Sequence, residues 1–86
     1  MVAAEGKAEV SSRARVASHL IALRRRKGLT QAELAVLSGL HRTYVCSIEQ
    51  GERNVSVDNL DRLAFALDVD VARLLRPLPG PSGKSA

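Results

Sequence analysis

The apolar residues in the middle of the chain recur at steps of three and four, and helix-capping signals interrupt this spacing at short intervals. The clearest stripe consists of Val16, Leu20 and Leu23, which occupy positions i, i+4 and i+7 of one helical face. No segment shows the alternation of apolar and polar residues that a half-buried strand requires. The spacing therefore predicts an all-α fold built from short helices.

Capping signals set the expected boundaries of the first three helices. Gly28 follows the last turn of the first helix, where glycine adopts the left-handed conformation at little cost. Thr30 and Glu33 have the spacing of a capping box at the start of a second helix. Gly39 then permits a sharp turn into a third. The predicted helices are 12–27, 31–38 and 42–50.

Two more helices are predicted after a polar loop. Ser56 is the expected cap of the fourth, whose apolar positions are Leu60, Leu63, Ala64 and Leu67. Asp70 is the expected cap of a short fifth helix that ends at Leu75, before Pro77. We therefore expect one five-helix domain over residues 11–76. Residues 1–10 and the Pro/Gly/Ser-rich residues 77–86 are predicted to be flexible tails.

Composition limits what this domain can do. A chain of 86 residues buries only a modest core, which makes a catalytic cleft with several walls hard to build. Tyr44 and Phe65 are the only aromatic residues, so the core must be aliphatic. Thirteen Lys and Arg against nine Asp and Glu give a net charge of +4, which favours polyanionic partners.

Several function classes lack the residues they need. Cys46 is the only cysteine and there are two histidines, so no zinc-ligand spacing exists and no metal or other cofactor is expected. No Ser/His/Asp set, paired carboxylates or phosphate-binding loop indicates an enzyme, and nothing indicates a small-molecule effector. Neither a signal peptide nor a membrane-spanning stretch is recognisable, so we expect a cytoplasmic protein with no membrane partner.

The most informative spacing lies within residues 31–50. Ala35 supplies a small side chain where two helices cross closely, and Gly39 supplies the tight turn between them. Leu34, Val45 and Ile48 would fill the wedge between the two helices. The outward face of the second of these helices then carries polar or small side chains that suit a DNA major groove. These are Arg42, Thr43, Cys46, Ser47 and Gln50.

Three segments together resemble the Cro/repressor, or Xre, family of helix-turn-helix regulators. They are LRRRKGLTQAELA (23–35), SGLHRTYVCSIEQGER (38–53) and LDRLAFALDVDVARLL (60–75). The resemblance implies a lambda-repressor-like domain whose second and third helices form the helix-turn-helix. Within the family, HRTYVCSIEQGERN (41–54) is most similar to restriction–modification controller proteins.

The resemblance also implies roles for individual residues. Arg42, Thr43 and Ser47, with Cys46 beside them, would contact bases. Phosphates would be contacted by Gln31, Tyr44, Gln50, Arg53 and Asn54. Arg24 and Glu49 would form a structural ion pair between the first and third helices. Leu74 and Leu75 would contribute to a dimer interface and also complete the core.

Some of these residues have alternative interpretations. Arg25, Arg26 and Lys27 could contact phosphates, but basic residues are also favoured at the C-terminus of any solvated helix. Cys46 could sense redox state, but it has no resolving cysteine and small residues are common where a helix approaches bases.

The expected function is a transcription regulator that binds an inverted repeat in double-stranded DNA as a homodimer, because two recognition helices double the length of the site. The alternative is an antitoxin-like protein-interaction module on the same scaffold. Acidic or large apolar residues on the outward face of helix 42–50 would favour that alternative, whereas Arg42, Thr43 and Ser47 favour DNA.

Overall fold

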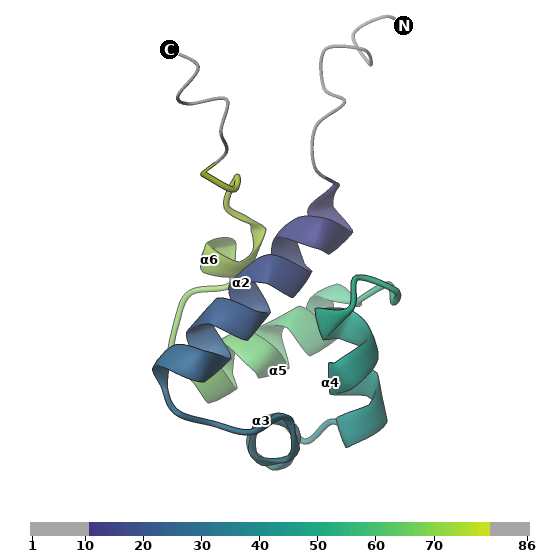
Figure 1. The fold of residues 1–86 in the computed structure, drawn as a ribbon, viewed down its shortest axis with the longest axis vertical. Helices are drawn as coiled ribbons and strands as arrows, with labels where there is room; N and C mark the ends of the chain where they lie inside the picture. The colour runs from purple at the N-terminus through teal and green to yellow at the C-terminus, as the bar shows by residue number, and fades with distance from the viewer. Residues whose placement is uncertain (1–10, 80–86) are drawn as a thin grey trace, which may run out of the picture.

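The structure, a computed structural model, describes residues 11–79 of the 86. Within this range the chain forms five helices and no strand, which confirms the predicted all-α fold (Figure 1). The helices are α2 (Ser12–Arg26), α3 (Gln31–Ser38), α4 (Arg42–Glu49), α5 (Val57–Leu67) and α6 (Ala72–Leu75). The predicted N-terminal tail, and all of the predicted C-terminal tail beyond residue 79, lie outside the described residues.

The capping signals act as expected from the sequence. The Thr30 hydroxyl accepts a bond from the Glu33 amide at 3.0 Å, and the Glu33 carboxylate accepts one from the Thr30 amide at 2.8 Å. Ser56 caps α5 by accepting from the Asn59 amide. At the start of α6 the Asp70 carboxylate accepts from the Ala72 amide, but the N-cap residue is Val71 and not the predicted Asp70.

Two helix ends fall one residue earlier than predicted. α2 ends at Arg26 and α4 at Glu49, so that Lys27 and Gln50 are the respective C-cap residues. Both cap residues still donate their backbone N–H to carbonyls of the preceding turn. The difference therefore concerns the last backbone dihedral angles, which a sequence pattern does not specify.

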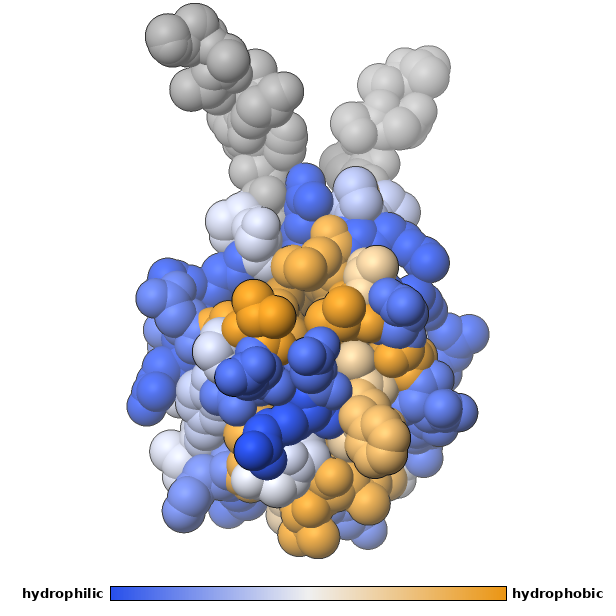
Figure 2. All heavy atoms as spheres, turned by 180° about the vertical axis from the view of Figure 1, so that it is seen from behind, coloured by the Kyte–Doolittle hydropathy of each residue, from blue (hydrophilic) through white to orange (hydrophobic). Residues whose placement is uncertain are grey.

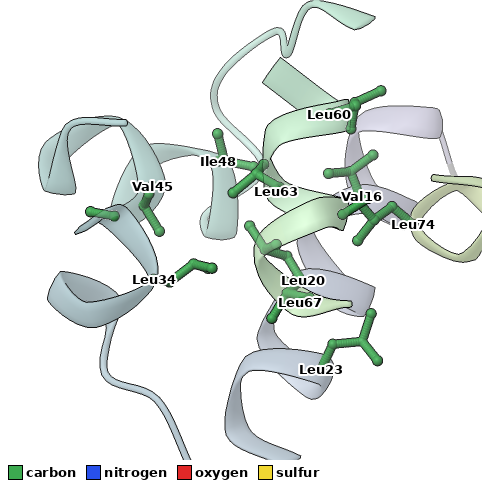
Figure 3. Close-up of a cluster of buried hydrophobic side chains, with 12 residues drawn as sticks. Val16, Leu20, Leu23, Leu34, Val45, Ile48, Leu60, Leu63, Leu67 and Leu74 are labelled. Carbon is green, nitrogen blue, oxygen red and sulfur yellow. The ribbon is translucent and has the colours of Figure 1, made fainter. Parts of the chain in front are cut away.

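The core is aliphatic and draws on all five helices (Figure 3). The predicted stripe of α2 and the predicted apolar positions of α5 are buried, and Leu74 of α6 is fully buried beside them. Leu34, Val45 and Ile48 are at most 1% exposed and occupy the wedge between α3, α4 and α5. This wedge sets how α4 sits on the rest of the domain.

Helix α2 packs against both α4 and α6, whereas α3 packs against α4 and α5. Two bonds hold the end of α6 and the residue after it on α2. Arg15 donates to the Leu75 carbonyl, and a ring nitrogen of His19 lies 2.8 Å from the Arg76 carbonyl. The beginning and the end of the described chain consequently lie at the same end of the molecule, while α3 lies at the opposite end (Figure 1).

Candidate DNA interface

The turn between α3 and α4 depends on two small residues. Gly39 has a φ of +74°, a conformation that side chains with a Cβ rarely adopt, and a Cβ there would lie 3.2 Å from an Arg62 guanidinium nitrogen. Ala35 is only 5% exposed, and its carbonyl accepts a bond from the Leu40 amide across the turn. The angle between α3 and α4 is therefore closely defined by the sequence.

Helix α4 presents one face to the core and another to solvent. Val45, Ile48 and Glu49 are buried. Arg42 and Thr43, in the first turn, are exposed, and so is Gln50 at the C-cap, while Cys46 and Ser47 between them are half-buried. The structure thus places the predicted base-contacting residues on the side of α4 that faces away from the core.

An ion pair attaches α4 to α2. The Arg24 guanidinium donates to both carboxylate oxygens of Glu49, at 2.6 and 3.0 Å, and these side chains are only 12% and 5% exposed. Arg24 also donates to the Leu29 carbonyl at 2.8 Å. The hydrogen bond to Glu49 raises the pKa of Arg24 above its usual value, burial partly opposes this, and the charge of Glu49 adds to it. The bidentate geometry fixes the orientation of α4 as well as its distance from α2.

Gln31, the first residue of α3, joins the same network. Its amide nitrogen donates to Glu49 at 2.8 Å. A side-chain amide carries two N–H groups and one oxygen, so one donor and the acceptor remain for a ligand such as a phosphate. Gln31 therefore combines a structural bond to α4 with the capacity for the predicted phosphate contact.

A second polar network holds the loop that follows α4. The Tyr44 hydroxyl donates to the Asn54 carbonyl at 3.3 Å and accepts from the Asn59 side chain at 3.1 Å. The Arg53 guanidinium lies 5.4 Å from the centre of the Tyr44 ring, within the range of a cation–π contact. Two of the residues expected to contact phosphate, Arg53 and Asn54, are exposed. The Tyr44 hydroxyl is instead hydrogen-bonded within the protein.

Two participants in this loop network were not among the residues that the sequence singled out. Asn59 binds the Tyr44 hydroxyl, and Arg13 donates to the Asn54 side chain at 2.6 Å across 41 positions of sequence. Such pairs depend on how helices pack, so no local motif reveals them. Their effect is to connect the loop after α4 to both α2 and α5.

Leu74 and Leu75, the expected dimer contacts, differ in their exposure within the single chain. Leu74 is 0% exposed within the single chain, so it belongs to the core and is not available on the surface. Leu75 is 36% exposed, and Phe65 of α5 is 84% exposed. Figure 2 shows hydrophobic residues gathered among charged ones on the side of the molecule opposite the view in Figure 1.

At the end of α2, Arg25, Arg26 and Lys27 lie exposed. Arg26 and Lys27 line a shallow hollow together with Leu67, Asp68 and Arg73, which places them beside α5 and α6 rather than α4. Across residues 11–79, no three His, Cys, Asp or Glu side chains are grouped as metal ligands. In that same part of the chain, none of the helices combines the length and hydrophobicity needed to cross a membrane.

Comparison with known proteins gives a consistent result. The helix-turn-helix family HTH_3 matches residues 20–74. Control protein C.SmaI of Serratia marcescens is 45% identical over 60 residues, which are 70% of this chain and 71% of that protein.

Two solved structures are also similar. The restriction–modification controller protein C.AhdI of Aeromonas hydrophila is 47% identical with a TM-score of 0.70, covering 72% of this chain and 94% of that one. The hypothetical transcription factor NHTF of Neisseria is 37% identical with a TM-score of 0.77, covering 88% and 86%.

Proposed function

Because the chain belongs to the helix-turn-helix family HTH_3, we propose that it is a cytoplasmic transcription regulator of the restriction–modification controller type. In this proposal residues 11–76 form the DNA-binding domain, and a homodimer binds an inverted repeat in double-stranded DNA. A dimer is needed because a single recognition helix contacts too few base pairs for a specific site.

One observation carries the proposal: α4 has an outward face of polar and small side chains, and its orientation is fixed by the buried Arg24–Glu49 pair. Arg42, in the first turn, has the length and the planar donors to bond guanine O6 and N7 together. Thr43 offers a methyl group to thymine and a hydroxyl to other bases. Ser47 and Cys46 are small enough to let the helix approach the base edges.

The phosphate contacts of the proposal surround this helix. Gln31 lies at the start of α3, where free backbone amides also attract a phosphate. Gln50, Arg53 and Asn54 lie exposed at the C-terminal end of α4 and in its loop. Tyr44 supports this group chiefly by holding the loop, because its hydroxyl is bonded to Asn54 and Asn59.

An antitoxin-like protein-interaction module is the second candidate. It is favoured by Val36 and Leu37 of α3, which are 80% and 55% exposed and could meet an apolar partner surface. The outward face of α4, however, carries neither acidic nor large apolar side chains. DNA therefore remains the better fit for α4.

Selection of bound duplexes from a random library tests the proposal directly. An inverted repeat with half-sites about one helical turn, roughly 34 Å, apart is the expected result. Failure to enrich any sequence, together with no measurable affinity for duplex DNA, would favour the protein-interaction alternative.

Two variants then separate base recognition from phosphate binding. Arg42→Ala should weaken operator binding by about 1–3 kcal/mol and relax the preference at one base pair in each half-site. Arg53→Gln should weaken binding to all duplexes alike and make the salt dependence shallower by about one unit for each phosphate that is no longer bound. If Arg42→Ala lowers affinity for every sequence equally, α4 is not the element that recognises bases.

A further inference from the structure

Arg13 lies in the first turn of α2, seven residues before the segment that matches the helix-turn-helix family begins at residue 20. It is nevertheless bonded to the loop after α4, since its Nη2 donates to the Asn54 Oδ1 at 2.6 Å. Both residues are exposed. The packing of α2 thus brings a cation from outside the family segment to the end of the proposed recognition helix.

The bond to Asn54 leaves binding capacity free on both partners. A guanidinium has five N–H donors, of which this bond uses one. Because the Asn54 oxygen accepts from Arg13, the side-chain NH₂ of Asn54 is directed elsewhere, and it retains two donors. Several donors are therefore available next to one another on the surface.

A second cation lies close by. Arg13, Arg53 and Asn54 line the same hollow between the start of α2 and the loop. Within residues 11–79 the guanidinium groups of Arg13 and Arg53 form no ion pair. The ion pair in that range joins Arg24 and Glu49. Among the described residues, no carboxylate lies at salt-bridge distance to neutralise the positive charge of this hollow.

We propose that Arg13, Arg53 and the Asn54 amide form a binding site for a DNA backbone phosphate, in which Arg13 is a direct contact. The inference rests on the proposed function and extends the DNA footprint beyond the matched helix-turn-helix segment. Guanidinium groups suit this role because their planar donors match phosphate oxygens. Asn54 positions the Arg13 side chain, which reduces the conformational freedom that binding would otherwise remove.

The test measures the affinity of Arg13→Gln for the selected operator duplex and for a random-sequence duplex between about 50 and 200 mM salt. Each phosphate that is no longer bound makes the slope of log K against log salt shallower by about 0.9. Between the two salt concentrations, the affinity of the variant should therefore fall about 3.5-fold less than that of the unaltered protein if one phosphate contact is lost. If a dimer loses one contact in each subunit, the difference should be about twelvefold. The pattern of base preference should stay unchanged.

Two further variants make the result specific. Arg26→Gln changes the same residue type at the other end of α2, beside α5 and α6, and should leave the salt slope unchanged. Arg13→Lys retains the charge and should restore most of the slope. If Arg13 only holds Asn54 in place and contacts no phosphate, Arg13→Gln would instead alter the affinity for DNA without altering the salt slope.

The outcomes separate this inference from the proposed function. If Arg53→Gln reduces the slope but Arg13→Gln does not, Arg13 is not a phosphate contact, although the regulator proposal stands. Equal reductions from Arg13→Gln and Arg26→Gln would show a general effect of net charge and would overturn the site. Absence of DNA binding by the unaltered protein would overturn both proposals.

Discussion

Glu49 is the residue through which α4 is attached to its neighbours. Its carboxylate receives bonds from Arg24 of α2 and from Gln31 of α3, while the side chain itself is 5% exposed. Removing one member of a buried ion pair leaves the other as an unpaired charge with little access to water. The stability of the domain and the orientation of the proposed recognition helix therefore depend on the same group.

Replacement of Glu49 by alanine should lower the free energy of unfolding by about 3–5 kcal/mol, because Arg24 is then left without its partner. This is a large part of the roughly 5–10 kcal/mol expected for so small a domain. Urea unfolding followed by circular dichroism gives the value. Glu52→Ala is the matched control, since Glu52 is exposed, and should change stability by less than about 0.5 kcal/mol. A decrease for Glu49→Ala as small as that of the control would contradict a structural role for the pair.

The Arg24 charge itself should not make stability depend on pH under ordinary conditions. Its folded-state pKa is raised above the usual value for arginine, chiefly by the hydrogen bond to Glu49. A raised pKa contributes stability that is fully present below the unfolded value and is lost only as the pH rises through the folded value. That window lies far above neutral pH.

Among individual residues, the sequence indicates those that belong to a family pattern but not those whose contacts depend on how the helices pack. Arg24 and Glu49 were identified through the resemblance to Xre regulators, and the structure brings them together. Arg13 and Asn59 were not identified, because their partners Asn54 and Tyr44 are set by how α2 and α5 meet the loop.

The helix boundaries are predictable to within one residue where a local signal exists. The start of α3 is marked by Thr30 with Glu33, and the start of α5 by Ser56. Gly28 follows the end of α2, and Gly39 follows the end of α3. The end of α5 is different, since its C-cap is Asp68 with a φ of +59°. Aspartate at this position gives no clear signal, because its side chain also suits helix starts and turns.

Asp68 combines two unfavourable features. A left-handed conformation is strained for a residue with a Cβ, and a negative charge at a helix C-terminus opposes the helix dipole. Asp68→Gly should therefore raise the free energy of unfolding by about 0.5–1 kcal/mol, after allowance for the greater flexibility of glycine in the unfolded chain. Thermal unfolding at neutral pH and low salt measures the change.

Asp68→Asn separates the two causes, because it removes the charge and keeps the Cβ. It should give only the part of the gain that comes from the dipole, a few tenths of a kcal/mol. A decrease in stability for the glycine variant would mean that the Asp68 carboxylate makes a favourable contribution that outweighs the strain.

For the molecule as a whole, exposed apolar side chains occur on the α5–α6 half as well as at Val36 and Leu37 of α3. Phe65 is 84% exposed in the single chain, which is unusual for a large aromatic residue in a domain whose core is aliphatic. Leu75, which the sequence indicated as a dimer contact, is also partly exposed. The sequence did not distinguish Leu75 from Leu74, since a helix of four residues is too short for periodicity to define its inner face.

Phe65→Lys should disrupt the proposed dimer. An aromatic anchor at an interface typically contributes about 2 kcal/mol or more. Because a two-fold interface contains the residue twice, the dimer dissociation constant should rise about a thousandfold, equivalent to roughly 4 kcal/mol. Sedimentation at micromolar concentration should find a dimer for the unaltered chain and a monomer for the variant.

Val57→Lys provides the control, because Val57 is 71% exposed at the opposite end of the same helix. This variant should remain dimeric. A strict monomer for the unaltered protein, with and without DNA, would remove the dimer from the proposed function. Equal disruption by both variants would place the interface along the whole of α5.

The end of α6 is held on α2 by contacts in space and not by chain connectivity, because the two helices are the last and the first of the described chain. Arg15 and His19 bind carbonyls of residues 75 and 76, so the two ends of the described chain are neighbours in space (Figure 1). A circularly permuted protein could therefore join these ends through a short linker and open new ones at the exposed Gly28. Its first helix would be α3 and its last α2. A helical content and an operator preference equal to those of the natural order would show that the α2–α6 contact needs no particular chain order.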